Sequence, residues 1–155
     1  MSEELLALAA RCEAATRPSL LLERDIAIAI YVDAWPIAGN EARVSVWDGN
    51  GRTQLTVKPY TTSLDAAMTL VPEGHTVQMS DWDHEILRAK GPWQAIVLPM
   101  GARGSMQQFT FSNRCDHAQT AALALTAAAL RARAATPILE GEASALPCPT
   151  STGDV

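Results

Sequence analysis

RVSVWDGNGRTQLTV, residues 43–57, carries the clearest structural signal in the chain. Apolar and polar residues alternate on both sides of DGNG at 48–51, which is a sequence typical of a hairpin turn. The apolar positions of the two arms are Val44, Val46, Leu55 and Val57. Alternation is the pattern of a half-buried strand, so the sequence predicts an antiparallel hairpin formed by 43–47 and 53–57.

Two helices are predicted before this hairpin. Residues 2–15 begin with a capping serine and two glutamates and continue with an apolar stripe at helical spacing. Residues 20–32 contain Ile26, Ile28 and Ile30, an alternation that also fits a strand. We favour a buried helix there, because the intervening alanines are equally apolar, and the strand remains the alternative.

Two helices and further strands are predicted after the hairpin. Thr62 and Asp65 resemble a capping box for a helix that Pro72 ends, with its apolar face at Leu64, Ala67, Met68 and Val71. Strands are expected at 75–82, with Val77 and Met79 inward, at 93–98 and at 107–111. An Ala-rich helix that ends at Ala135 is expected to be capped by Asp116 or Ser112.

This order predicts an α+β domain over residues 1–135 and a flexible tail over 136–155, where no periodicity is visible. The expected architecture is a layered α/β/α sandwich with a mainly antiparallel sheet of about 4–5 strands and a long C-terminal helix. Because 27 of the 155 residues are alanine, the core is expected to lack bulk and the domain to self-associate as a homo-oligomer.

Composition excludes several classes of protein. A hydrophobic fraction of 48% is too high for a mostly disordered chain, and no apolar run is long enough to cross a bilayer. The formal net charge of −5 and the absence of a basic stripe argue against binding of nucleic acid polymers, although not against a small phosphate-bearing ligand. Three cysteines, an odd number with no paired spacing, and an acidic N-terminus favour a cytoplasmic protein.

Three stretches resemble the phage ABA sandwich family of small phage and prophage proteins: MSEELLALAAR at 1–11, YTTSLDAA at 60–67 leading to VPEG at 71–74, and the Ala-rich helix at 121–135. With the segments between them they cover about residues 1–135. The resemblance implies a layered α/β/α fold and a phage origin. It implies no reaction and no catalytic residue.

Polar clusters offer little catalytic chemistry. DWDHE at 81–85 combines carboxylates with an imidazole, but its spacing fits no metal motif and a solvated loop explains it better. Cys115 and His117 would supply only two ligands, so no metal and no cofactor are expected. Neither a nucleophile elbow nor a nucleotide-binding glycine motif is present.

Candidate ligand contacts come from one cation and several aromatic residues. Arg103 lies among glycines in GARGS at 101–105, where backbone amides and a guanidinium could meet a phosphate, although a plain hairpin turn is the simpler explanation. Half of the aromatic residues are tryptophans, which can stack on a base or fill the edge of a core that lacks bulk. The aromatic candidates are Trp47, Trp82, Trp93 and Tyr60.

We therefore expect a non-enzymatic binding protein encoded by a phage. Its sharpest form is a counter-defence sponge that sequesters a nucleotide-type immune signal of the host between subunits. One alternative is a protein-interaction accessory or inhibitor that docks on a host protein. The other is a metal-dependent hydrolase that uses the Asp81–Glu85 cluster.

Overall fold

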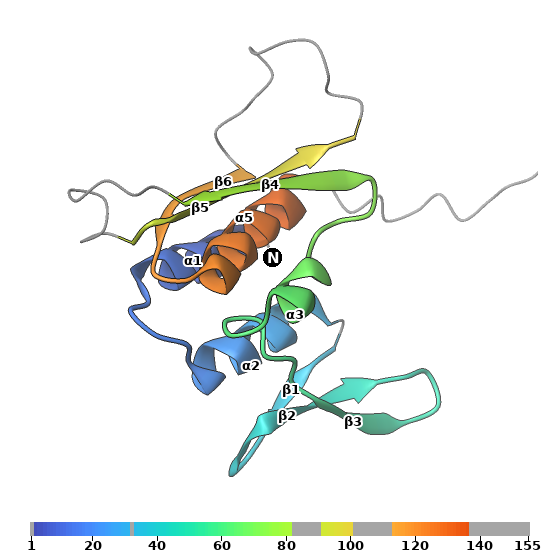
Figure 1. Ribbon diagram of the computed structural model, residues 1–155. Coiled ribbons are helices and arrows are strands. Elements are labelled where there is room, and N and C mark those ends of the chain that lie inside the picture. Colours follow the sequence, from blue (N-terminus) through green and yellow to red (C-terminus); the bar gives the residue numbers. More distant parts are fainter. Residues whose placement is uncertain (1, 32, 82–90, 101–112, 137–155) are drawn as a thin grey trace, which may run out of the picture.

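The structure is a computed structural model that describes residues 2–31, 33–81, 91–100 and 113–136 (Figure 1). Helices and strands follow one another as α1 (Ser2–Ala14), α2 (Leu20–Ile30), β1 (Trp35–Ile37), β2 (Asn40–Trp47), β3 (Arg52–Thr56), α3 (Leu64–Met68), β4 (His75–Asp81), β5 (Trp93–Pro99), β6 (Arg114–Ala118) and α5 (Ala121–Ala135).

Helix α5 forms the centre of the core. Every residue from Ala122 to Leu130 is buried, as expected of a helix that is apolar on all sides. The small alanines let α1, α3, β5 and β6 approach it closely. Its one buried hydroxyl, Thr126 Oγ1, donates to the carbonyl of Tyr60 at 2.7 Å, which satisfies a polar group inside the apolar interior.

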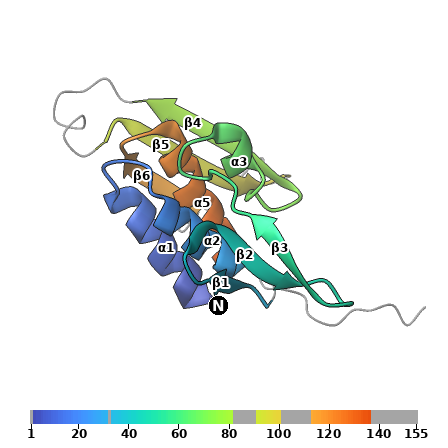
Figure 2. The ribbon, with the colours of Figure 1, turned by 90° about the horizontal axis from the view of Figure 1, so that it is seen from below.

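Within the described residues, the strands form two separate three-stranded sheets, with orders β1-β2-β3 and β4-β5-β6, and every pairing among them is antiparallel. Figure 1 shows the β4–β6 sheet against α1 and α5, and the β1–β3 sheet below α2 on the other side of the helices. Figure 2, seen from below, shows β2 crossing α2. The described helices therefore lie between the two sheets.

The α+β class and the antiparallel pairing are thus confirmed, whereas a single sheet of 4–5 strands is wrong. The apolar face of the hairpin, Val44 and Val46, is buried beside α2 instead of extending a larger sheet. Segment 57–74, which contains α3, separates β3 from β4 along the chain. Helix packing therefore takes the place of strand pairing between the two halves.

Several predicted elements are confirmed. Segment 20–32 is helical over Leu20–Ile30, with Ser19 as its N-cap, so the strand alternative is excluded. The hairpin has the predicted turn, and Val77 and Met79 pack against the core from β4. The predicted strand at 107–111 and the tail from 137 onward lie outside the described residues.

Two helix caps were predicted wrongly. Thr120, whose side chain accepts from Leu123 N, caps α5, and Asp116 lies in β6; Ser112, the other candidate, is not among the described residues. Ser63 rather than Thr62 caps α3. The buried face of α3 also differs from the prediction: Ala66 and Ala67 are buried, whereas Leu64 and Met68, which were predicted to point inward, are exposed.

Within the described ranges, no helix combines the length and the apolar character that crossing a membrane requires.

Candidate functional site

The outer face of the β1–β3 sheet gathers aromatic and cationic side chains. Alternation directs Val44 and Val46 of β2 toward the helices, and the residues between them toward solvent. The register pairs Trp35 with Ser45, Ser45 with Gln54 and Trp47 with Arg52, so these side chains share one face. We call this surface the Trp/Arg face; it consists of Trp35, Arg43, Ser45, Trp47, Arg52 and Gln54.

Both tryptophans of this face are exposed to a degree unusual for so large an apolar side chain. Trp35 is 58% exposed and Trp47 is 55% exposed, against a mostly buried set of aliphatic side chains in the core. They are diagonal neighbours, because Trp47 lies two residues beyond Ser45, the partner of Trp35. Diagonal neighbours on one sheet face are about 7–8 Å apart.

Arg52 extends from β3 across the middle strand toward Trp35. It is paired with Trp47, and its Nη1 donates to Ser45 Oγ at 3.4 Å. Its Cζ lies 6.0 Å from the ring centroid of Trp35, which is within cation–π range. The guanidinium is thereby held at Ser45 in the middle strand, a residue that neighbours Trp35 across the strands and Trp47 along β2.

The second cation, Arg43, lies further along β2 on the same face. Its Nη1 donates to Gln54 Oε1 at 3.3 Å, which holds the side chain along the sheet. Glu41, two residues before Arg43, follows the same alternation and brings one negative charge to that end. The positive charge of the face is therefore concentrated around Arg52, at the end that carries the tryptophans.

Local sequence explains why this face is presented. Asp48 Oδ1 accepts hydrogen bonds from the backbone N–H groups of Asn50 and Gly51, at 2.9 and 3.0 Å, and so fixes the hairpin turn. Gly39, with φ of 74°, supplies the left-handed conformation needed between β1 and β2. A register shift after Pro36 ends the regular pairing of β1 with β2. Strand β1 therefore contributes one residue to the face, Trp35 at its start.

The chemistry available here is recognition. An exposed indole offers a flat surface on which a base can stack, and a guanidinium binds phosphate oxygens through paired N–H groups. The face carries no cysteine and no histidine. A ligand that combines an aromatic ring with a phosphate would match both kinds of side chain.

The structure does not bring the sequence-predicted site residues together. Trp47 belongs to the Trp/Arg face, whereas Trp93 begins β5 in the other sheet, beyond the helices, and packs against the core. Tyr60 is fully buried, and burial raises the pKa of its phenol. Arg103 and Trp82 lie outside the described residues, so their ligand contacts remain predictions.

Sequence reasoning missed three members of the face: Trp35, Arg43 and Arg52. The hairpin register alone would have placed both arginines on the same face as Trp47, because positions 43, 45 and 47 alternate with 44 and 46 and face 56, 54 and 52. The strand that contains Trp35 had no comparable signal. Its Trp-Pro sequence indicates a break in a helix, and only the tertiary structure shows that it pairs with β2.

A metal or nucleophilic site finds no support in the described part of the chain. No group of three or more His, Cys, Asp or Glu side chains there could hold a metal ion. Asp81 is exposed at the end of β4, and the rest of the predicted 81–85 cluster falls outside the described ranges. Cys12 and Cys115 are buried free thiols, and burial raises the pKa of each to about 12, which keeps both neutral.

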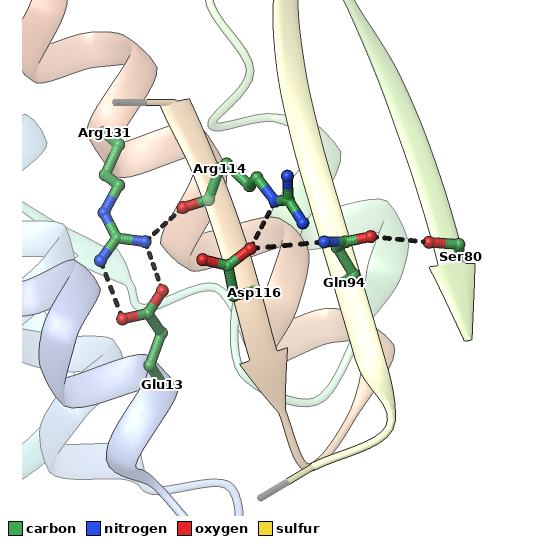
Figure 3. Close-up of polar contacts among 6 residues, drawn as sticks. All are labelled: Glu13, Ser80, Gln94, Arg114, Asp116 and Arg131. Atoms are coloured by element: carbon green, nitrogen blue, oxygen red, sulfur yellow. Dashed lines mark hydrogen bonds and ion pairs between the residues drawn. The ribbon is translucent and has the colours of Figure 1, made fainter. Parts of the chain in front are cut away.

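A second polar arrangement crosses the β4–β6 sheet (Figure 3). Ser80 Oγ donates to Gln94 Oε1 at 3.2 Å, Gln94 Nε2 donates to Asp116 Oδ1 at 3.4 Å, and Asp116 also pairs with Arg114. The β5–β6 register shifts between Trp93 and Ala95, opposite Asp116. This row satisfies its own polar groups, so it stabilises the sheet and offers fewer free donors than the Trp/Arg face.

Figure 3 also shows the ion pair that joins α1 to α5. Both Glu13 oxygens accept from the Arg131 guanidinium, with Nη2 to Oε2 at 2.8 Å, and Nη1 also donates to the carbonyl of Arg114. The hydrogen bonds to Glu13 raise the pKa of Arg131. With its donors committed to protein acceptors, this arginine has a structural role.

Comparisons of the chain with protein-family models, with curated proteins and with solved structures found no match.

Proposed function

We propose that the chain is a non-enzymatic binding protein whose Trp/Arg face takes a nucleotide-type ligand. A base would stack on an exposed indole, and a phosphate would meet Arg52. The observation that carries the proposal is the position of Arg52, which is paired with Trp47 in the register and holds its Cζ 6.0 Å from the Trp35 ring centroid. Core packing does not account for two indoles of this size that are each more than half exposed.

A docking surface for a host protein is the second candidate, because tryptophan and arginine are also the residues most enriched at interaction hot spots. Charge separates the two candidates. A ligand for this face must bring negative charge to Arg52, and every nucleotide does so, whereas a protein partner does so only if its surface is acidic. We therefore place the nucleotide-type ligand first.

The wider expectations remain proposals. They are the relation to the phage ABA sandwich family with its α/β/α layering, the sequestration of a host immune signal, and the homo-oligomer. The hydrolase alternative, which depends on residues 81–85, also remains a prediction.

Isothermal titration calorimetry with 5′-AMP, adenosine and ribose 5-phosphate tests the proposal. We expect 5′-AMP to bind, and each partial ligand to bind more weakly, because each lacks one of the two contacts. Stacking on an aromatic side chain contributes about 1–3 kcal/mol per base, so a double variant that replaces both Trp35 and Trp47 by alanine should weaken 5′-AMP binding about 5- to 150-fold.

Matched variants locate the site. Trp35→Ala, Trp47→Ala and Arg52→Ala remove its parts one at a time. Met68→Ala and Arg17→Ala remove an exposed apolar and an exposed cationic side chain elsewhere. Weakened binding in the first group alone supports the proposal. Failure of 5′-AMP and of dinucleotides to bind, or equal effects of both groups, overturns it.

A further inference from the structure

We infer that the ligand of the Trp/Arg face is a dinucleotide: two bases joined by a phosphodiester, in linear or cyclic form. This inference rests on the proposed function and specifies its ligand. It follows from the arrangement of the face, in which the Arg52 guanidinium reaches Ser45 and both tryptophans are neighbours of that serine. Two bases joined by a phosphate match two indoles beside one guanidinium, whereas a mononucleotide supplies only one base.

The spacing of the two tryptophans supports two separate bases. Trp35 and Trp47 are diagonal neighbours through Ser45, which places them about 7–8 Å apart. Successive stacked bases in a nucleic acid strand rise by only about 3.4 Å. The two indoles therefore start from positions farther apart than two bases that stack directly on each other. Two bases can cover both indoles when they separate from each other and each stacks on its own tryptophan.

The guanidinium of Arg52 lies where the linking phosphate of such a ligand would pass. Its hydrogen bond to Ser45 Oγ, at 3.4 Å, holds it at the residue that neighbours both tryptophans on the face. A neutral hydroxyl is a weaker partner for a guanidinium than a charged phosphate, so a phosphate can take that place. Arg43, one step further along β2, is placed to meet a second phosphate.

Charge limits the length of the ligand. Glu41 follows Arg43 on the same face, so the positive charge ends there. The whole chain carries a formal net charge of −5, which opposes a long polyanion. Two cations beside two indoles suffice for two nucleotides, and the described strands extend no further basic row on this face.

The experiment compares 5′-AMP, the linear dinucleotide pApA, cyclic di-AMP and the tetranucleotide pApApApA by calorimetry against the full chain. We expect at least one dinucleotide to bind about tenfold or more tighter than 5′-AMP, since it gains a second stacked base. The ranking of pApA against cyclic di-AMP tells which form the face takes. The tetranucleotide should gain less than about threefold over pApA, because no further stacking residue is available to it.

Variants separate this inference from the proposed function. Trp35→Ala or Trp47→Ala should each reduce dinucleotide affinity to about that of 5′-AMP, and each should change 5′-AMP affinity by only about twofold, because the remaining indole still takes one base. Arg52→Lys keeps the charge and should weaken dinucleotides less than Arg52→Ala. Circular dichroism spectra of the variants verify that they fold.

Equal affinities for 5′-AMP and both dinucleotides overturn the inference and leave the proposed function standing. A tetranucleotide that binds more than about tenfold tighter than pApA also overturns it, in favour of a longer strand. Dinucleotide binding that neither tryptophan substitution affects overturns the inference and the Trp/Arg face together.

Discussion

Replacing Glu23 by alanine should loosen the connection between the two halves of the fold. This carboxyl group is only 5% exposed on α2, and its Oε1 accepts three hydrogen bonds from the segment that follows β3. The donors are Thr61 N at 3.1 Å, Thr61 Oγ1 at 2.6 Å and Thr62 Oγ1 at 3.3 Å. These hydrogen bonds connect the segment that follows β3 to helix α2.

The expected loss of stability depends on which hydrogen-bond donors lose their acceptor. Thr61 is fully buried, so in Glu23→Ala its N–H and hydroxyl are left without this acceptor, whereas water can replace the bond to exposed Thr62. Each unsatisfied buried group costs about 1–3 kcal/mol, so the two groups give a loss of about 2–6 kcal/mol in the free energy of unfolding. Glu23→Gln keeps an oxygen acceptor in place and should cost about 1 kcal/mol or less.

Urea unfolding followed by circular dichroism at 222 nm measures both variants, with exposed Glu73→Ala as the control that should stay within about 0.5 kcal/mol of the original chain. A Glu23→Ala variant as stable as the control would refute the reasoning. So would equal losses in Glu23→Gln and Glu23→Ala, because the effect would then come from the charge and not from the acceptor.

Two further predictions concern the core. Gly91→Ala should lower the free energy of unfolding by about 2–5 kcal/mol in the same assay. Gly91 has φ of +112°, and a Cβ added to it would lie 2.4 Å from the backbone carbonyl carbon of Ala118. A change below about 0.5 kcal/mol would contradict this close approach. Cys12 and Cys115 bind their protons more tightly when folded, with pKa values of about 12 against 9.0, so their contribution to stability is complete below pH 9 and is lost as the pH rises toward 12. Unfolding titrations at pH 8, 9, 10 and 11 should therefore show decreasing stability above pH 9, and a Cys12→Ala, Cys115→Ala variant with the same decline would contradict this cause.

Local patterns predicted the helices and the hairpin well because their causes are local. The apolar stripe of α1, the DGNG turn and the Ala-rich run of α5 depend on residues within a few positions of one another. The division into two sheets depends on helix packing between distant segments. It cannot be read from strand patterns, which are the same for one sheet as for two.

The candidate site was predicted in part for the same reason. Trp47 was identified because tryptophans are rare and large, and the hairpin register places Arg52 beside it. Trp35 joins them only through the three-residue strand β1, whose sequence WPI indicates a break in regular structure. Tyr60 was a candidate because an aromatic residue before a helix cap can face a ligand, but the carbonyl of its backbone is bonded to Thr126 and its ring is buried.

The most direct test of the binding face is the indole Nε1–H region of a ¹H–¹⁵N correlation spectrum, assigned through single Trp→Phe variants, during titration with pApA and cyclic di-AMP. The account predicts saturable shifts of the Trp35 and Trp47 signals, with the Trp93 signal unchanged because this residue lies in the other sheet. Signals of Trp35 and Trp47 that stay in place at millimolar ligand, or a shift confined to Trp93, would contradict it.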